Sequence, residues 1–183
     1  HMRSSKFFAV LAAVGGMLLA VGAYAADEPA KDGAPAAQAA PAAAVPAAGG
    51  NAGSMTPIDR VLATEKGKLK NPFTDNAEAI EEGKKAYLSF SCNGCHGGGG
   101  GGGMCPSLIN EVWVYGGDDD TLFRLITLGS VELQKAGYKR VRTETVVGPM
   151  PPYRDIITDE AKLWKVIAWI RSVWTGRPEK REW

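Results

Sequence analysis

Residues 92–96 read Cys-Asn-Gly-Cys-His, two cysteines three positions apart with a histidine directly after the second. This spacing is the attachment pattern of a c-type haem. Each thiol adds to one vinyl group of the porphyrin, and a two-residue gap lets one helical turn present both sulfurs to the same ring edge. The following imidazole is placed to bind the iron. Cys92, Cys95 and His96 are therefore predicted to hold one covalently bound haem c, with His96 as a metal ligand.

Two other kinds of site use closely spaced cysteines, a zinc knuckle and a thioredoxin-like redox pair. Zinc needs a second pair of ligands, whereas the chain has only one further cysteine, Cys105. A redox pair does not require the histidine, and no strand-like segment leads into the motif. Because haem attachment uses Cys92 and Cys95, we expect Cys105 to be a free, buried thiol rather than a link between two chains.

The first residues have the pattern of an export signal, predicted to be residues 1–25. Arg3 and Lys6 supply a positive start, residues 7–21 are apolar, and Ala23-Tyr24-Ala25 is a small-x-small cleavage site. The apolar run of about 15 residues is shorter than the roughly 20 that span a bilayer, so an uncleaved membrane anchor is the weaker alternative. Since c-type haem is joined to proteins outside the bacterial cytoplasm, the sequence predicts a periplasmic protein that contacts a membrane only if the signal is not cleaved.

Residues 26–55 are rich in Ala, Pro and Gly and contain almost no large apolar side chain. Such a segment cannot bury enough surface to offset the entropy lost on ordering, so a disordered linker is predicted. Residues 56–183 are then the predicted cytochrome c domain, long enough for one core around a large apolar cofactor.

The charge balance argues against one class of partner. The chain has 21 Lys and Arg against 20 Asp and Glu, and loss of Arg3 and Lys6 with the signal leaves 19 against 20. A near-neutral chain lacks the basic excess of nucleic-acid-binding proteins, so no nucleic-acid partner is predicted. Basic residues do cluster between positions 131 and 147, but acidic residues among them favour a solvated surface over a docking patch.

The first strong helical pattern covers residues 76–90, with Asp75 or Asn76 as the N-cap. Gly83 lies inside this helix, where glycine costs roughly 1 kcal/mol relative to alanine. Close approach by another helix would explain the glycine, and a tolerated weak position is the alternative.

Two further helices follow. Asp118-Asp119-Asp120 are helix-starting acids and Gly129 is a helix-ending residue, which predicts a helix between them. The three aspartates lack the alternating spacing of a calcium loop, so capping is favoured over calcium binding. A last helix is predicted over residues 158–175, with Thr158 as its N-cap and Gly176 at its end.

A second iron ligand has few candidates. Once the signal is removed, His96 is the only histidine, and the methionines are Met55, Met104 and Met150. Met150 lies in Gly148-Pro149-Met150-Pro151-Pro152, where the prolines fix backbone angles and would hold a thioether in place. A thioether ligand is typical of electron-transfer cytochromes. Met150 is therefore the predicted second metal ligand, and Met104 is the weaker candidate.

The other ring nitrogen of a haem-binding histidine needs a hydrogen-bond acceptor, commonly a backbone carbonyl. Pro106, ten residues after His96, is the predicted acceptor and so belongs to the cofactor-binding residues. Between them lie seven glycines, Gly97 to Gly103. No strand precedes this run and no Gly-Lys-Ser/Thr ending follows it, so a loop along the haem edge is favoured over a phosphate loop.

This order of helix, Cys-x-x-Cys-His, proline loop, middle helix, methionine loop and aromatic last helix resembles a class I c-type cytochrome. The resemblance covers residues 76–176. It implies an all-α class I cytochrome c fold, in which the N- and C-terminal helices cross around one covalently bound haem. Gly83 would lie at that crossing, against Trp169 or Ile170.

Four stretches carry a narrower resemblance: Cys-Asn-Gly-Cys-His-Gly, Met-Cys-Pro-Ser-Leu, Trp-Val-Tyr-Gly-Gly-Asp-Asp-Asp-Thr-Leu-Phe-Arg-Leu and Val-Val-Gly-Pro-Met-Pro-Pro-Tyr. They are similar to the XoxG-type electron acceptors of lanthanide-dependent methanol dehydrogenases, which are related to cytochrome cL. The resemblance implies an electron-transfer protein rather than an enzyme. Its partners would be a quinoprotein methanol or alcohol dehydrogenase that uses pyrroloquinoline quinone (PQQ), and a downstream cytochrome c. Trp113 and Tyr115 match an aromatic pair of that family, whereas its calcium site has no clear counterpart here.

Two alternative functions remain open from the sequence. One is a haem protein with an open distal site, acting as a gas sensor or redox enzyme. The other is a generic carrier to an oxidase. Peroxidase chemistry is disfavoured because the sequence offers no second histidine and no acid–base constellation around a substrate pocket.

Overall fold

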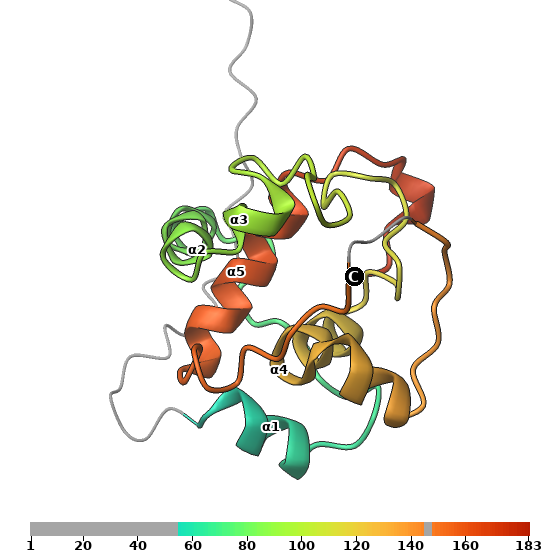
Figure 1. The fold of residues 1–183 in the computed structure, drawn as a ribbon. Helices are drawn as coiled ribbons and strands as arrows, with labels where there is room; N and C mark the ends of the chain where they lie inside the picture. Colours follow the sequence, from blue (N-terminus) through green and yellow to red (C-terminus); the bar gives the residue numbers. More distant parts are fainter. Residues whose placement is uncertain (1–54, 145–147) are drawn as a thin grey trace, which may run out of the picture. The chain divides into compact units, whose positions relative to one another are not determined.

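The computed structural model describes residues 55–144 and 148–183. They form α1 (Pro57–Ala63), α2 (Ala77–Ser89), α3 (Asn93–His96), α4 (Asp119–Lys135), α5 (Glu160–Ser172) and the 3-10 turn η1 (Pro178–Lys180) (Figure 1). No strand occurs among the described residues, so the predicted all-α class is confirmed. None of their helices is both long and apolar enough to cross a membrane. The predicted signal and all but the last residue of the predicted linker lie outside the described residues, and these boundaries stay predictions.

α2 and α5 cross and make the most extensive contact between any two described helices. α2 buries Ala79, Gly83 and Tyr87, which are spaced four residues apart and share one face of the helix. A side chain at Gly83 would overlap the backbone carbonyl of Lys165, and its Cβ would lie 3.1 Å from the Cβ of Trp169. The prediction that Gly83 permits close approach by the last helix is confirmed.

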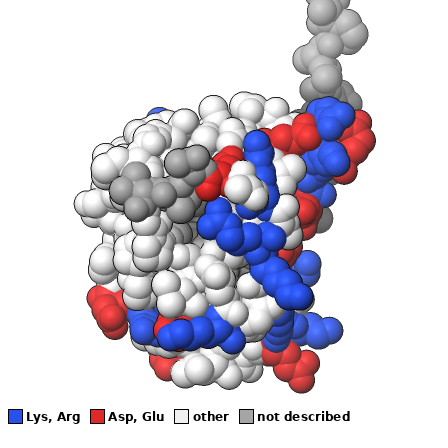
Figure 2. Space-filling view, turned by 45° about the vertical axis from the view of Figure 1, so that its right-hand side comes forward, with Lys and Arg blue, Asp and Glu red and all other residues white. Residues whose placement is uncertain are grey.

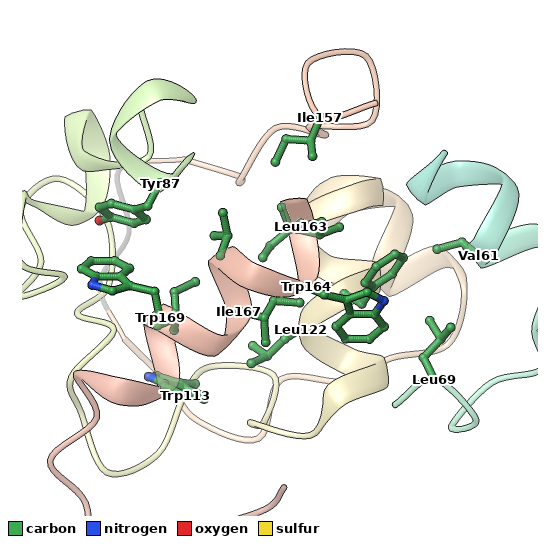
Figure 3. Packing of buried hydrophobic residues seen from close by; sticks show 14 residues of the cluster. Val61, Leu69, Tyr87, Trp113, Leu122, Ile157, Leu163, Trp164, Ile167 and Trp169 are labelled. Carbon is green, nitrogen blue, oxygen red and sulfur yellow. The ribbon is translucent and has the colours of Figure 1, made fainter. Parts of the chain in front are cut away.

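α5 connects the other helices into one core, because it is buried over most of its circumference. The ring of Trp169 packs on Tyr87 of α2 with ring centroids 4.2 Å apart. Nearer its start, Trp164 packs on Phe123 of α4, also at 4.2 Å. Figure 3 shows Trp169 beside Tyr87 and Trp164 farther along α5, with Leu163 and Ile167 between them. The aromatic side chains of α5 therefore join it to α2 on one side and to α4 on the other.

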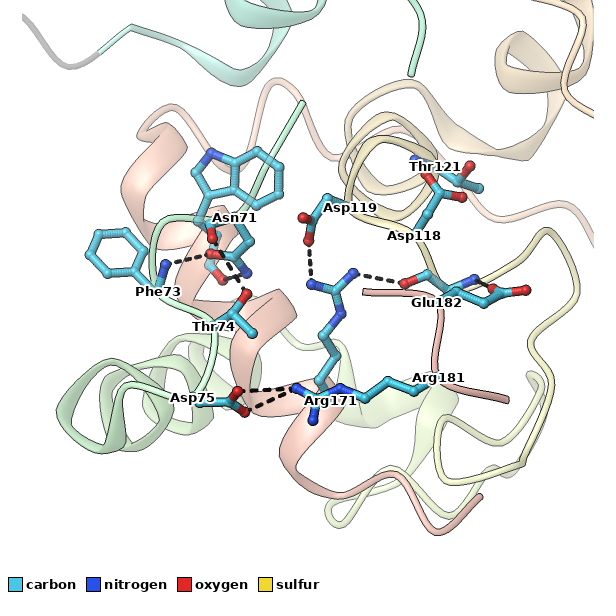
Figure 4. A network of polar contacts seen from close by, with 12 residues as sticks. Asn71, Phe73, Thr74, Asp75, Asp118, Asp119, Thr121, Arg171, Arg181 and Glu182 are labelled. Atoms are coloured by element: carbon cyan, nitrogen blue, oxygen red, sulfur yellow. Dashed lines mark hydrogen bonds and ion pairs between the residues drawn. The ribbon is translucent and has the colours of Figure 1, made fainter. Parts of the chain in front are cut away.

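The three adjacent aspartates have different roles in the structure. The Asp118 side chain accepts a hydrogen bond from the backbone N–H of Thr121 at 2.9 Å, which is the predicted N-cap. Asp119 is buried and forms an ion pair with Arg171 of α5, as Figure 4 shows. Arg171 also donates to the Gly117 carbonyl at 2.7 Å. Asp119 therefore joins the start of α4 to α5, a role that capping alone does not describe.

Asp120 is 2% exposed and forms an ion pair with Arg124, one turn along α4, at 3.1 Å. The hydroxyl of Tyr138 also donates to Asp120. Arg124 in turn donates to the carbonyls of Val61 at 3.2 Å and Thr64 at 2.6 Å. These carbonyls lie at the end of α1, so Arg124 satisfies groups that a helix end leaves without intrahelical partners.

The predicted helix boundaries need three corrections. α1 was not predicted, because seven residues are too few to show helical periodicity. α5 begins one residue later than predicted, since Asp159 rather than Thr158 is its N-cap and accepts from the Ala161 N–H at 2.8 Å. α5 also ends at Ser172, before Gly176, because the chain then turns away and the Thr175 N–H bonds the Ile109 carbonyl at 3.1 Å.

The α2–α5 crossing predicts a specific sensitivity at Gly83. Alanine alone would favour the helix by roughly 1 kcal/mol. At Gly83 the added methyl overlaps the Lys165 carbonyl, so Gly83→Ala is expected to lower the free energy of unfolding by about 1–3 kcal/mol in urea denaturation. Gly99→Ala is the matched control, because a Cβ there has no neighbour within 4 Å. Equal stability of Gly83→Ala and the wild type would contradict the close approach.

The Asp120 network predicts a dependence of stability on pH. Burial by itself raises the pKa of Asp120, but the hydrogen bonds from Tyr138 and Arg124 outweigh it and the pKa is lowered. The resulting stability is fully present above about pH 4, the ordinary pKa of Asp, and is lost as the pH falls through the lower folded value.

Asp120→Asn removes the charge from a buried pair and should cost about 3–5 kcal/mol at pH 7. The difference from wild type should shrink as urea denaturation is repeated below pH 4. Asp155→Asn, at an exposed position, is the control and should change the free energy of unfolding little. A gap between wild type and Asp120→Asn that stays constant down to pH 3 would refute the assignment.

Candidate functional site

α3 carries the cysteine–histidine motif as a single helical turn. The N–H of Cys92 donates to the Tyr87 carbonyl at 3.1 Å, which ties the motif to the end of α2. The N–H of His96 donates to the Cys92 carbonyl at 3.0 Å and closes the turn. Cys92 and Cys95 are half-buried free thiols. The motif therefore forms the turn that its spacing predicts, and its position follows directly from that of α2.

A cavity of about 410 Å³ opens beside α3, within the size range of small-molecule and cofactor sites. The loop between α3 and α4 and the helix α4 contribute most of its wall, α2 and α5 contribute a few side chains, and most of the wall is apolar. Cys92, His96, Pro106 and Met150 all line it. The structure therefore brings together four of the five predicted site residues around one cavity. Cys95 lies on the same turn but is not part of the wall.

The His96 imidazole is oriented by a single hydrogen bond. Its Nδ1 lies 2.8 Å from the carbonyl oxygen of Pro106, the acceptor expected from the sequence. Because a carbonyl can only accept, Nδ1 must carry the hydrogen, and the lone pair is then on Nε2. Burial lowers the pKa of His96, and the hydrogen bond to Pro106 opposes this only in part. The ring is therefore neutral near pH 7, the form in which imidazole binds a metal.

Met150 is held against α4 by its backbone. Its N–H donates to the hydroxyl of Ser130 at 3.0 Å, and the Ser130 N–H donates to its carbonyl at 2.9 Å. Gly129 has φ +73°, and a Cβ there would lie 2.7 Å from the Met150 carbonyl oxygen. The N–H of Tyr153 donates to the Ile126 carbonyl at 2.9 Å and fixes the other end of the loop.

Gly129 ends the first helical segment of α4, as the sequence predicted. Its backbone angles, φ 73° and ψ 168°, are not helical, so α4 consists of two helical segments that meet at a kink at Gly129. Glycine is needed there because its backbone adopts a left-handed conformation and leaves room for the methionine loop. Gly129 thus ends a helical segment and also makes room for the methionine loop at the cavity wall.

The glycine run folds back toward the motif. The N–H of Gly102 donates to the His96 carbonyl at 2.9 Å, and the N–H of Leu108 donates to the Gly100 carbonyl at 2.7 Å. The hydroxyl of Tyr87 donates to the Gly97 carbonyl at 2.7 Å. These bonds place the run beside the motif and bring Pro106 within reach of the histidine.

Cys105 is half-buried rather than buried as predicted, and it is a free thiol. Its sulfur contacts that of Cys95. Burial, followed by this contact, raises the pKa of Cys105 to about 11. At neutral pH it is therefore a protonated, weakly nucleophilic thiol.

Trp113 and Tyr115 both lie in the cavity wall. The indole N–H of Trp113 donates to the Leu108 carbonyl at 2.8 Å, and the Gln134 side chain donates to the Tyr115 hydroxyl at 2.7 Å. The Trp113 ring also stacks on Trp183, with centroids 5.6 Å apart. Hydrogen bonds to both side chains, and ring stacking on Trp113, therefore hold the aromatic pair in place.

Two residues of the site were not predicted from the sequence. Ser130 anchors Met150, and no sequence signal marks a serine that bonds a loop twenty residues away. Arg140 reaches the cavity wall from the segment after α4. Its position in a basic cluster indicated only a charged surface.

A known protein family matches the part of the chain that runs from within α2 to within α5. A family model described as "Cytochrome C oxidase, cbb3-type, subunit III" matches residues 78–170, just over half of the chain. The cbb3-type cytochrome c oxidase subunit CcoP of Azospirillum brasilense is 36% identical over 83 residues, 42% of this chain. The aligned part spans 28% of that relative's length.

Two solved structures of cytochrome cL are also similar to the chain. The protein from the marine methylotrophic bacterium Methylophaga aminisulfidivorans MPT is 24% identical to this chain. The matched region covers 73% of this chain and 76% of that protein, with a TM-score of 0.48. The protein from Hyphomicrobium denitrificans is 27% identical to this chain. The matched region covers 62% of this chain and 58% of that protein, with a TM-score of 0.48.

The donor groups of the cavity fit a c-type haem. The wall is apolar, as a porphyrin face requires, and it presents a neutral imidazole and a thioether sulfur beside a turn with two thiols. The expected resemblance to class I c-type cytochromes is confirmed by the match over residues 78–170. The chain belongs to the family of cbb3-type cytochrome c oxidase subunit III, and it is a class I c-type cytochrome with covalently bound haem c.

Proposed function

We propose that this cytochrome is a periplasmic single-haem electron carrier in which His96 and Met150 are the two axial ligands of the iron. The observation that carries the proposal is that both side chains line one apolar cavity beside Cys92. When bound, haem c supplies an iron that alternates between the ferric and ferrous states, and a thioether ligand raises its potential. Cys92 and Cys95 would form the thioether bonds.

The chain's own residues support a rigid redox site. Pro106 fixes the orientation of the His96 ring, and Ser130 fixes the backbone of Met150. The apolar wall excludes water from the cofactor faces. A site whose ligands stay in place when the charge changes suits electron transfer.

A carrier is favoured over an enzyme by the chemistry of the wall. Among the described residues that line the cavity there is no Asp, no Glu and no second histidine. Haem enzymes that cleave bonds in a substrate usually need such an acid–base group near the iron. An open-site sensor would not need Met150 held in the wall by two backbone hydrogen bonds.

For the electron donor we propose a PQQ-dependent methanol dehydrogenase of the lanthanide-dependent type, with a downstream cytochrome c as the acceptor. The support is the likeness of four sequence stretches to the acceptors of those enzymes. Each of these stretches contributes a residue to the cavity wall, among them His96, Trp113 and Met150. The second candidate is a carrier associated with an oxidase, which the 36% identity to subunit CcoP favours.

The ligand assignment is tested by Met150→Ala in the haem-loaded protein. Loss of the thioether should lower the reduction potential and open one side of the iron, so that the ferrous protein binds carbon monoxide readily. Met104→Ala is the matched control, because Met104 is 58% exposed and should leave the spectrum and potential unchanged. Rapid carbon monoxide binding by the wild type would instead support an open distal site.

The donor is tested by stopped-flow mixing of the oxidised cytochrome with substrate-reduced methanol dehydrogenase, and separately with a cbb3-type oxidase. We expect rapid reduction by the dehydrogenase, monitored by haem absorbance. A rate that falls with added salt would show that charged surfaces guide the encounter. Slow reduction at all salt concentrations, together with rapid oxidation by the oxidase, would favour the second candidate.

A further inference from the structure

A second cavity, of about 120 Å³, shares no lining residue with the haem cavity in the described part of the chain. We call it the C-terminal cavity, because residues of the segment 174–183 line it together with residues of α5, of α2 and of the segment before α2. A buried water needs only about 10–15 Å³, so the C-terminal cavity has room for a larger group.

Arg171 of α5 lines the C-terminal cavity and has an unsatisfied donor. The residue is 7% exposed, its Nη1 pairs with Asp119, and its Nη2 donates to the Gly117 carbonyl at 2.7 Å. Its Nε has no hydrogen-bond partner among the described residues. A buried donor without a partner is costly, and native proteins rarely leave one unpaired. An acceptor bound in the C-terminal cavity would remove this cost.

Arg181 brings a second guanidinium to the same cavity. Figure 4 shows its side chain reaching from the C-terminal segment to Asp75, whose two oxygens accept from its Nη2 at 3.1 and 3.2 Å. The Asp75 side chain is 76% exposed, and ion pairs at such positions contribute little to stability. The Nε and Nη1 groups of Arg181 make no hydrogen bond within the described part of the chain, so they are available to a further acceptor.

The charged groups of the C-terminal cavity favour an anion. Among the described residues its lining holds two guanidinium groups and one carboxylate, that of Asp75. Asp119, the partner of Arg171, does not line it. The two guanidinium carbons lie 4.8 Å (Arg171) and 5.2 Å (Arg181) from the ring centroid of Trp183. The two cations are therefore near each other, and an anion in the cavity lowers the repulsion between them.

The rest of the lining indicates the class of anion. Its apolar residues are Ile80, Ala168, Trp174 and Trp183. The hydroxyl hydrogens of Thr74 and Ser172 are already donated to backbone carbonyls, so the guanidinium groups are the donors that remain. A few charged donors beside apolar surface suit a carboxylate with a short apolar part. They suit inorganic phosphate less, because its oxygens would lie against apolar surface without donors.

We propose that the C-terminal cavity binds a short-chain monocarboxylate, whose carboxylate accepts hydrogen bonds from Arg171 and Arg181 and whose apolar end contacts the tryptophan side chains. The cavity lies where α5, the segment before α2 and the C-terminal segment meet, so the ligand stabilises the folded state. The inference goes beyond electron transfer, and it depends neither on the axial ligands of the iron nor on the electron donor.

Acetate is the probe for the test. Calorimetric titration of the haem-loaded protein with sodium acetate, at constant ionic strength maintained with sodium chloride, should show one saturable site. The ¹H–¹⁵N resonance of the Arg171 Nε group should shift with the same Kd, because this N–H gains an acceptor. At a free acetate concentration ten times Kd, the unfolding equilibrium constant in urea should fall about elevenfold.

Surface charge alone also attracts anions, and the control has to separate this effect from the site. Figure 2 shows that Lys and Arg side chains gather on the face that the right-hand side of Figure 1 turns forward. Arg177 is an exposed arginine of the same segment that pairs with Glu111 at 2.8 Å and does not line the cavity. We expect Arg181→Gln to weaken acetate binding by about threefold to tenfold, and Arg177→Gln to leave it near that of wild type.

Asp75→Asn should have the opposite effect. The Asp75 carboxylate competes with the ligand for Arg181 and repels it, so its loss should tighten acetate binding by about threefold. A purely structural role of the ion pair between Asp75 and Arg181 predicts a loss of stability in both variants and no opposite changes in acetate affinity.

Three results would overturn the proposal. They are the absence of saturable acetate binding, an equal response to phosphate at the same ionic strength, and equal weakening in Arg181→Gln and Arg177→Gln. The first would mean that the Arg171 Nε bonds only water. If Arg181→Gln does not fold, Asp75→Asn decides instead, and acetate binding that is unchanged or weaker in that variant would refute the site. Because no electron-transfer partner is present, failure of the proposed donor would leave these results unaffected.

Discussion

The contact between the backbone of Gly83 and the carbonyl of Lys165 is the constraint on which the rest of the structure depends. It lets α2 and α5 approach more closely than any larger residue would permit. Tyr87 then packs on Trp169, and the turn that carries the haem motif begins directly where α2 ends. The position of the two thiols and of His96 is therefore set by a glycine one helix away. Close packing of this kind tolerates little change in volume.

A second close approach brings the methionine loop to the cavity. Gly129 takes up a left-handed conformation inside α4, and the carbonyl of Met150 occupies the space that a side chain would fill. Ser130 then bonds both backbone groups of Met150. The two proposed axial ligands are thus each held by backbone geometry next to a glycine, one through α2 and one through α4. Both line one apolar cavity, whose wall comes mainly from the loop between α3 and α4 and from α4.

Buried ion pairs also connect α4 to the neighbouring helices. Asp119 pairs with Arg171 of α5, while Asp120 and Arg124 attach α1 to α4. Taking such charges out of water is costly, and the cost is offset only when geometry and further hydrogen bonds are good. Arg124 meets this condition by donating to two carbonyls at the end of α1. These pairs specify which helix ends meet, whereas the apolar core supplies most of the cohesion.

The sequence by itself determined the features that depend on neighbours within one or two turns. The haem motif, the N-caps Asn76 and Asp118, and the glycine of the helix crossing could all be predicted from spacing and residue type. Pro106, ten residues after His96, could be named as the acceptor because a haem-binding histidine commonly donates to a backbone carbonyl. The tertiary structure alone decided the partners of Asp119 and Asp120, the second helical segment of α4 after Gly129, and the place of Arg140 in the wall. Each of these depends on segments that are distant in the chain, and local propensity contains no information about which distant group will fill a given space.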